Sequence, residues 1–348
     1  MKLYVRPIFS SQHASGSKFI RLGSSNLKFS NIEIILKNKN KITKKIIRIK
    51  DIEKLDLEKK EIIKVFLKNI SKKRKSIVGL KFDKPNIMGI LNITPDSFYD
   101  GGNFLPLKSA KDQYLKMIKE GADIIDIGGE STRPSSKTVE MKEELKRILP
   151  VIKEIRKYGK RIPLSLDTRK PEVMLAGIRE GIKIINDVSG LRYSNKTIPI
   201  LNKKNIPIII MHSISTPKAM QNKINYQDVL LDVYDFLEKK IIDCEKKNIS
   251  RSQIIIDPGI GFGKNTKQNL KLIENISLFH SLGVCILLGA SRKSFISKAM
   301  KSNLVHNRLG GSIASVIYAL SQGVQIFRVH DVHETLQAVS IYKNISKL

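Results

Sequence analysis

The sequence has few cysteines, few acidic residues near its start and no long apolar run, and each shortage excludes a class of protein. Its two cysteines, Cys244 and Cys285, stand in an expected helix and an expected strand without metal-ligand spacing. They predict buried thiols in a reducing compartment, not a disulfide or a zinc site. No apolar run is long enough to cross a bilayer, and the start lacks the apolar core of a secretory signal. We therefore expect a cytoplasmic protein with no membrane partner.

The scarcity of acidic residues is greatest at the front of the chain. The first acidic residue is Glu33, and an acid-poor start containing Ser and Arg leaves a mitochondrial presequence as a minor alternative. Residues 1–85 hold 23 Lys and Arg against 7 Asp and Glu, within a formal net charge of +31. Lys, Ile and Asn are abundant throughout the chain. The positive charge therefore indicates a genome-wide bias in amino-acid composition as readily as a binding face.

A nucleic-acid partner is nevertheless not expected. The dense basic run Lys72–Lys75 has no interleaved aromatic residues, whereas a platform that stacks on bases requires them. We interpret this run as a solvated charged face or linker. The positive charge would still attract anionic substrates at low salt.

The composition shifts at Pro85, which predicts a boundary between two unequal parts. Length alone allows two ordinary domains or one large α/β barrel in 348 residues. Residues 1–85 are predicted to be a basic N-terminal accessory segment and residues 86–348 the catalytic domain. Residues 1–30 show no sustained period, so we expect them to be largely irregular. The elements expected before Pro85 are strands at Phe19–Leu22, Ile32–Leu36 and Ile46–Ile49 and a helix over Ile52–Ile70.

From Ile87 onward, apolar strand-like runs alternate with amphipathic helices. The expected strands begin near residues 87, 123, 162, 183, 207, 253, 285 and 325. Their mean spacing of about 34 residues suits a strand, a helix and two loops, and eight such units are the size of a (β/α)8 TIM barrel. A doubly wound open sheet is the alternative, but it does not need eight equivalent repeats, and no G-x-G-x-x-G turn follows the first strand.

Polar or charged residues follow nearly every expected strand, at the end where barrels assemble their active sites. In chain order these are Asn92, Asp126 with Gly128–Pro134, Asp167–Arg169, Asn186 with Asp187, Met211 with His212, Asp257–Lys264, Gly289–Phe295 and Arg328–His330. Any one of them has an ordinary interpretation as a helix cap or turn residue, and this is the first interpretation of Asp187 and Ser131. Eight together on one rim indicate an active site.

The residue types at these strand ends separate by charge. Asp167, Asn186 and Asp257 follow apolar strands, so we expect them deep in the barrel mouth, where a carboxylate needs hydrogen-bond donors. A carboxylate and an amide match the row of N–H groups along the edge of an aminopyrimidine. The sequence therefore predicts a flat, donor-rich ligand on this side.

The opposite side is predicted to hold an anion. Lys293, Arg328 and His330 bring positive charge from the last two strands, the usual phosphate corner of such barrels. Asn92 adds a neutral amide suited to a Mg²⁺-bound phosphate or water.

The strand-end segments resemble those of the dihydropteroate synthase family of the folate pathway. They read, in order, NITPDSF with DGG, GGESTRP, SLDT, INDVSG, DPGIGFGK, GASRKSF and RVHDV, from about residue 87 to residue 331. The resemblance implies condensation of 6-hydroxymethyl-7,8-dihydropterin pyrophosphate with p-aminobenzoate to give 7,8-dihydropteroate and pyrophosphate. It also implies Mg²⁺ as cofactor, a homodimer, and sulfonamides as inhibitors.

The resemblance assigns roles to individual residues. The implied pterin contacts are Asp167, Asn186, Asp257 and Lys293, with Met211 packing beside the ring. The implied pyrophosphate and Mg²⁺ group is Asn92, Arg328 and His330, with Asn92 at the metal. The implied p-aminobenzoate side is Thr132, Arg133, Pro134 and Ser294, with Phe98 and Asp100 on the first loop. The residues expected to be catalytic are Asp167, Asp257, Lys293 and Arg328.

The sequence departs from the family's pattern at three loop positions, Tyr99, Ser135 and Ser215, which puts loop conformation and inhibitor response in doubt. The charges favour a dissociative substitution in which a neutral arylamine attacks an electron-poor pterin methylene. No protein nucleophile is implied. The alternatives are a pterin-binding methyltransferase with a corrinoid partner, which shares the fold but not the TPDSF and SRKSF loops, and a nucleic-acid-binding protein on an inactive barrel.

Overall fold

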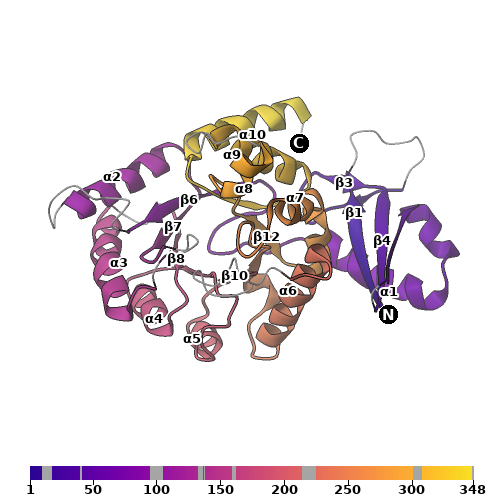
Figure 1. Ribbon diagram of the computed structural model, residues 1–348, viewed down its shortest axis with the longest axis horizontal. Helices are drawn as coiled ribbons and strands as arrows, with labels where there is room; N and C mark the ends of the chain where they lie inside the picture. The colour runs from indigo at the N-terminus through magenta and orange to yellow at the C-terminus, as the bar shows by residue number, and fades with distance from the viewer. Residues whose placement is uncertain are drawn as a thin grey trace.

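A computed structural model of the protein shows a barrel surrounded by helices, with a smaller N-terminal unit beside it (Figure 1). The structure describes residues 1–9, 18–39, 41–94, 105–131, 136, 138–158, 162–213, 225–300 and 308–346. In these ranges, no helix is both long enough and apolar enough to cross a membrane.

Eight parallel strands form the barrel, and the last pairs with the first to close it. They are β6 (Asn86–Asn92), β7 (Ile124–Gly128), β8 (Leu164–Asp167), β9 (Ile184–Asp187), β10 (Ile208–Met211), β11 (Ile254–Asp257), β12 (Cys285–Leu288) and β13 (Ile326–Val329). Each begins within two residues of its predicted start. The TIM barrel prediction is therefore confirmed, and the open-sheet alternative is wrong.

Helices follow the strands and cover the outside of the barrel. They are α2 (Leu105–Lys119), α3 (Met141–Arg156), α4 (Pro171–Arg179), α5 (Thr197–Lys204), α6 (Val229–Glu245), α7 (Thr266–Glu274), α8 (Ser294–Ala299), α9 (Leu309–Ser321) and α10 (Val332–Ser346), with short 3₁₀ turns η3 (Arg251–Gln253) and η4 (Ile276–Leu282). Local sequence fixes where several begin: Asp228 caps α6 by accepting from the backbone N–H groups of Leu230 and Leu231. The strands between them are apolar because both faces are buried.

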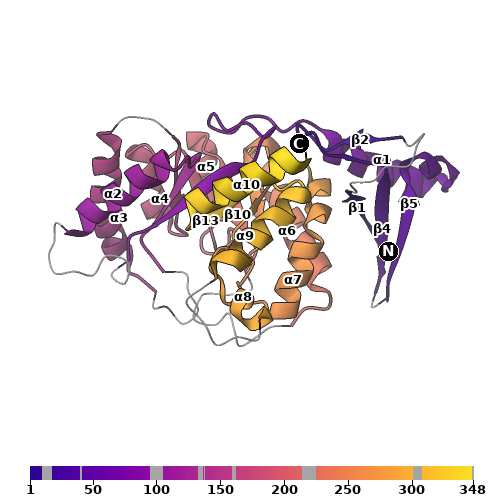
Figure 2. The same ribbon diagram turned by 90° about the horizontal axis from the view of Figure 1, so that it is seen from above.

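The N-terminal unit is a three-stranded antiparallel sheet in the order β1-β4-β5, covered on one face by α1. Its elements are β1 (Lys2–Ile8), β4 (Asn31–Asn38), β5 (Lys41–Arg48), η1 (Ile49–Lys54), α1 (Leu57–Ser71) and a small ribbon of β2 (Ile20–Arg21) and β3 (Lys28–Phe29). Figure 2 shows this sheet standing beside the barrel helices. A separate apolar core, which includes Val5, Phe29, Ile32 and Ile63, holds it together.

Two predictions for this unit are wrong. Residues 1–30 are not largely irregular, because β1 is a seven-residue strand. The helix expected over Ile52–Ile70 is interrupted, since the Asp56 side chain accepts from the N–H of Lys59 and begins α1 anew after η1. The strands expected near residues 20, 32 and 46 are present as β2, β4 and β5.

The N-terminal sheet is fixed to the barrel by charged and polar contacts along α6. Lys2 Nζ lies 2.7 Å from Asp235 Oδ1, Tyr4 donates to the same carboxylate at 3.0 Å, and Lys37 Nζ lies 3.0 Å from Asp232 Oδ1. The rings of Tyr4 and Tyr234 meet edge to face, 5.2 Å between centroids. Whether residues 1–85 contribute to the chemistry stays a prediction, as does the boundary at residue 85.

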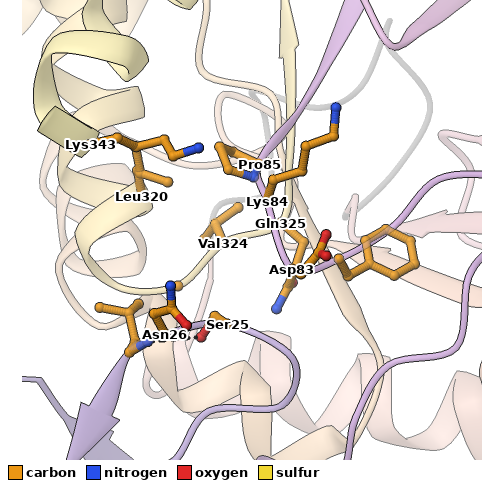
Figure 3. Close-up of a pocket in the computed structure, with 12 residues that line it drawn as sticks. Ser25, Asn26, Asp83, Lys84, Pro85, Leu320, Val324, Gln325 and Lys343 are labelled. Carbon is orange, nitrogen blue, oxygen red and sulfur yellow. Dashed lines mark hydrogen bonds between the residues drawn. The ribbon is translucent and has the colours of Figure 1, made fainter. Parts of the chain in front are cut away.

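A cavity of about 160 Å³ marks this junction at the end of the barrel where β6 and β13 begin (Figure 3). It is lined from the N-terminal unit by Ser25, Asn26 and Leu27, from the connecting segment before β6 by Phe82–Pro85, and from the barrel domain by Leu320, Gly323–Gln325 and Lys343. The strand-end motifs are at the opposite end, so this cavity is separate from the predicted active site.

Gly323 lines that cavity, and we predict that Gly323→Ala destabilises the protein by about 1–3 kcal/mol. Its φ is +81°, and an added Cβ would lie 2.2 Å from Cδ2 of the buried Leu22. Gly310→Ala is the matched control, since a Cβ there meets nothing within 4 Å and Ala favours the helix. Urea unfolding measures both, and equal free energies of unfolding would contradict the tight seating of Leu22.

Candidate active site

The predicted pterin residues lie side by side because of the register of the barrel strands. Asn92 is level with Gly128, Gly128 with Asp167, and Asp167 with Asn186 across β6 to β9. Met211 is similarly level with Asp257 across β10 and β11. The register therefore brings Asn92, Asp167 and Asn186 to one level at the carboxyl ends of β6, β8 and β9, and places Met211 beside Asp257.

Two glycines near the strand ends, Gly128 and Gly289, have no side chain and so leave space beside the polar groups of the site. A Cβ at Gly128 would lie 3.5 Å from both Asn92 Oδ1 and Asp167 Cβ. A Cβ at Gly289 would lie 3.6 Å from Asp257 Oδ2 and 3.8 Å from Lys293 Nζ. The space at Gly128 is thus next to Asn92 and Asp167, and the space at Gly289 is next to Asp257 and Lys293.

Arg328 crosses the mouth and lies between two buried carboxylates. Its Nε donates to Asp126 Oδ2 at 2.7 Å and its Nη2 donates to Asp167 Oδ2 at 2.9 Å. Asn186 Nδ2 donates to the same Asp126 oxygen at 2.9 Å. One guanidinium thus bridges the side chains of two buried acidic residues.

The electrostatics of this cluster follow from its burial. Asp126 is fully buried and Asp167 is 5% exposed. Burial raises the pKa of Asp167 to about 8; the charge of Arg328 opposes this shift and that of Asp126 adds to it. The two carboxylates raise the pKa of Arg328, outweighing the effect of its burial. An N–H-rich ligand edge is the partner that such a cluster can bind.

Asp257 and Lys293 form the other half of the site. Asp257 Oδ1 accepts from the N–H of Gly259 at 2.7 Å. Lys293 Nζ donates to the carbonyl of Ile260 and lies 4.5 Å from the centroid of the Phe262 ring. Burial lowers the pKa of Lys293 to about 8, and the nearby carboxylate of Asp257 opposes this shift. Burial raises the pKa of Asp257, and Lys293 opposes that shift in turn.

An apolar patch lies beside these charged groups. Met211 and Phe262 are 2% and 8% exposed and form a small cluster with Val188, separate from the barrel core. A thioether and an aromatic face are suited to packing against a flat ring. The placement of Met211 is therefore compatible with its predicted role beside the pterin.

His330 is present on the same rim but does not carry the positive charge that we expected. Its Nδ1 lies 3.0 Å from Ser291 Oγ, and burial lowers its pKa to about 4, with Arg328 and Arg292 lowering it further. The imidazole is therefore neutral at physiological pH in the free protein. Its remaining nitrogen can still donate a hydrogen bond to an anion.

The other predicted residues divide into those the structure places and those it does not describe. Asn92 is half-buried at the end of β6, and Ser294 is exposed at the first position of α8. Outside the described residues lie Phe98, Asp100, Thr132, Arg133 and Pro134, together with the departures Tyr99, Ser135 and Ser215. The p-aminobenzoate side therefore stays largely a prediction.

Two buried residues near the site were not assigned a role from sequence. Asp126 interrupts the apolar run of β7, and this lone acid in a buried strand was the available signal. Lys264 ends the glycine-rich loop after β11 and is 7% exposed. Asp187, by contrast, is the turn residue that we expected, since it accepts from the Ser189 N–H and hydroxyl and from the Leu191 N–H.

A third charged cluster supports the loop after β7. Glu130 accepts from Arg169 at 2.8 Å and from Lys170 at 2.7 Å, and Lys170 also pairs with the fully buried Glu144. This network joins the loops after β7 and β8 to α3. It fixes Glu130, which stands two residues before Thr132 in the sequence.

Comparison with known proteins identifies the family to which this arrangement belongs. Residues 88–330 match the family described as pterin binding enzyme. The dihydropteroate synthase of Escherichia coli K12 is 39% identical over 263 residues, 76% of this chain and 92% of that protein. The Haemophilus influenzae dihydropteroate synthase is 40% identical over 264 residues, 76% of this chain and 95% of that protein.

Solved structures agree. Xanthomonas albilineans dihydropteroate synthase with 4-aminobenzoic acid has a TM-score of 0.73 and 38% identity, covering 79% of this chain and 98% of that one. Yersinia pestis dihydropteroate synthase in a sulfonamide drug complex has a TM-score of 0.72 and 36% identity, covering 79% and 100%. The chain therefore belongs to the pterin binding enzyme family and, within it, to the dihydropteroate synthases.

Proposed function

We propose that the protein condenses 6-hydroxymethyl-7,8-dihydropterin pyrophosphate with p-aminobenzoate, giving 7,8-dihydropteroate and pyrophosphate for folate synthesis. The observation that carries the proposal is the group of buried polar side chains at the carboxyl ends of the barrel strands, Asp126, Asp167, Asn186 and Asp257, which matches the N–H-rich edge of a pterin. A dihydropteroate synthase from Xanthomonas albilineans has been solved with 7,8-dihydropteroate bound, which supports the same product here.

Each half of the site then has its own task in binding the pterin. The carboxylates of Asp167 and Asp257 accept hydrogen bonds from pterin N–H groups, and Lys293 donates to a pterin acceptor. Met211 and Phe262 pack against the ring. Because these groups are buried and fixed before substrate binds, they also favour the positive charge that develops on the pterin methylene.

The reaction breaks the methylene–oxygen bond and forms a methylene–nitrogen bond. The neutral arylamine supplies the electron pair, pyrophosphate leaves with the electrons of the broken bond, and the arylammonium then gives its proton to water. Cys244 and Cys285 are both buried and free, and burial raises the thiol pKa of each to about 12, so neither serves as a nucleophile.

Asn92 is the residue that we propose for Mg²⁺. Mg²⁺ commonly uses one or two protein oxygens with substrate phosphates and water. No cluster of three or more His, Cys, Asp or Glu side chains that could hold a metal occurs in the described part of the chain. Asn92 Oδ1, close to the space beside Gly128, fits a substrate-borne ion rather than a closed site. When bound, Mg²⁺ would stabilise the charge of the leaving pyrophosphate.

The decisive experiment is a turnover assay with both substrates, with and without Mg²⁺. We expect 7,8-dihydropteroate and pyrophosphate in equal amounts, with a requirement for Mg²⁺. The absence of both products from protein that binds the pterin pyrophosphate would overturn the proposed reaction.

We further propose that the protein acts in the cytoplasm, as a homodimer, on small molecules alone. The two free, buried thiols support a reducing compartment. Sedimentation equilibrium across a range of protein concentrations tests the dimer, and a single species with the mass of one chain would contradict it.

Lys293 gives a prediction for pH. Its ammonium is charged below its pKa of about 8 and neutral above it. We therefore expect kcat/KM for the pterin pyrophosphate, which reports on the free enzyme, to fall as pH rises through about 8. In Lys293→Arg the charge persists, so this fall should disappear although activity at pH 7 is lower. The exposed Lys298→Arg is the matched control. Identical pH profiles for Lys293→Arg and the wild type would show that another group controls the fall.

A further inference from the structure

Lys264 is a buried ammonium that none of the roles above uses. It is 7% exposed, and among the described residues it takes part in no ion pair. Burying an unpaired charge is costly unless hydrogen bonds compensate for the lost water. Lys264 directly follows loop 258–263, whose Gly259 N–H donates to Asp257 of the active site. The contacts that compensate for burying Lys264 are therefore made next to the active site.

The ammonium has a complete set of hydrogen-bond acceptors. It lies 2.8 Å from the carbonyl of Gly259, 3.0 Å from the carbonyl of Phe262 and 3.0 Å from Nδ1 of His212. The three donors of the ammonium meet these acceptors, and the His212 carbonyl lies 3.5 Å away as a fourth. Burial lowers the pKa of Lys264 well below its ordinary value and the charge of Asp257 opposes this shift, while the surrounding acceptors favour the protonated form. Burial, together with the charge of Lys264, holds the pKa of His212 well below its ordinary value, so the imidazole is neutral and Nδ1 accepts.

The loop needs these contacts because of its own sequence. Gly259, Gly261 and Gly263 have φ values of +70°, +84° and +64°, a conformation that glycine adopts at a high cost in chain entropy. Within the loop, the Phe262 N–H bonds the Gly259 carbonyl at 3.2 Å. Removing the ammonium would take this donor from the Phe262 carbonyl and would leave the Gly259 carbonyl with the Phe262 N–H alone.

The same loop fixes three groups of the pterin site. The N–H of Gly259 holds Asp257, the carbonyl of Ile260 holds Lys293, and the Phe262 ring packs with Met211. Its conformation therefore sets where a carboxylate, an ammonium and an aromatic face are presented.

We propose that Lys264 is a positioning residue whose ammonium holds loop 258–263 in its pterin-binding conformation, and so sets pterin affinity without contacting the substrate. The inference rests on the proposed pterin site. The hydrogen bond between Lys264 and His212 also connects the loop after β11 to the residue that follows β10.

The test is Lys264→Met, which keeps an unbranched apolar side chain one atom shorter and removes the donors. We expect the pterin pyrophosphate, titrated calorimetrically without p-aminobenzoate, to bind about 10-fold or more weakly. Hydrogen exchange of the peptide amides in loop 258–263 should accelerate in the same variant. Lys267→Met is the matched control, because Lys267 is exposed three residues further along, and it should leave both measurements unchanged.

Binding of a second ligand distinguishes a positioning role of Lys264 from a purely structural one. Inorganic pyrophosphate with Mg²⁺ should bind Lys264→Met within about 2-fold of wild type, because Asn92 and His330 lie outside this loop. All titrations are made well below the unfolding temperature of each variant. Normal pterin affinity in Lys264→Met, or equal weakening of both ligands, would overturn the inference.

A second variant keeps the inference testable if Lys264→Met does not fold. His212→Phe removes one acceptor but keeps an aromatic ring against Phe236, whose centroid is 4.9 Å from that of His212. We expect about 3-fold or greater weakening of pterin binding with loop exchange accelerated. Unchanged affinity and exchange would sink the proposal. Failure of the wild type itself to bind pterin would instead count against the proposed function.

Discussion

Asp257→Asn is expected to lower kcat/KM for the pterin pyrophosphate by about 100-fold or more, equivalent to about 3 kcal/mol. One carboxylate oxygen of Asp257 already accepts from the Gly259 N–H at 2.7 Å, and the other lies near Lys293. The amide in Asp257→Asn would place its NH₂ group, a donor, against either the Gly259 N–H or the donors on the other side of the side chain. It would also remove the negative charge that favours a cationic methylene.

Asp187→Asn is the matched control for this change. Asp187 is also a fully buried carboxylate at the end of a strand, but its contacts are to Ser189 and Leu191 in its own turn. We expect it to reduce stability while changing kcat/KM by less than about 3-fold. Steady-state kinetics and urea unfolding are measured on both variants. Near-normal catalytic efficiency in Asp257→Asn would remove this residue from the pterin site.

The barrel could be predicted from sequence because its strands are buried on both faces. The run Ile208–Met211 is continuously apolar and is followed by His212, and the run Ile254–Asp257 is apolar up to its final Asp257; the change to a polar residue marks the strand end. A parallel barrel then brings every such end to one rim, so sequence order alone predicts which residues meet. The register of β6 to β9 confirms that Asn92, Asp167 and Asn186 do so.

β1 could not be predicted in the same way, because its partners are distant in sequence. Its charged residues Lys2 and Arg6 interrupt the apolar pattern, and each is paired only in three dimensions. Lys2 pairs with Asp235 and Glu238, more than two hundred residues away, and Arg6 pairs with Glu33 on β4. A strand with both faces covered by different parts of the chain has no simple alternation to detect.

The protonation states were the least predictable part of the site. The sequence places His330 beside Arg328 and suggests added positive charge, yet burial and neighbouring cations keep that imidazole neutral. Similarly, Asp126 becomes a site residue only when Arg328, from the far end of the chain, donates to it. Charge in a buried site depends on which groups meet, and spacing along the chain does not contain that information.

Arg328→Met is expected to lower the free energy of unfolding by about 3 kcal/mol at pH 8 and to reduce kcat/KM by more than about 100-fold. The change removes the guanidinium from between Asp126 and Asp167, which are fully buried and 5% exposed. Two buried carboxylates are then left without their shared cation. Arg292→Met is the matched control, since Arg292 pairs with Asp331 on the same rim with 57% of its side chain exposed, and should cost less than about 1 kcal/mol.

The loss in Arg328→Met should be largest above pH 8 and should shrink as the pH falls toward 8. Without Arg328, the pKa of Asp167 rises above its wild-type value of about 8, so the folded variant binds a proton in a pH range where the folded wild type and the unfolded chain do not. The variant therefore gains stability on acidification from about pH 10 toward pH 8, whereas the wild type gains little until the pH falls through about 8. Adding Asp126→Asn to Arg328→Met should recover stability at pH 8 but no activity, because one of the two unpaired charges is gone while the pterin cluster stays incomplete. Urea unfolding at about pH 10 and at pH 8 measures this. A loss that does not depend on pH, or one that matches Arg292→Met, would show that Arg328 does not hold Asp167 in its charged form.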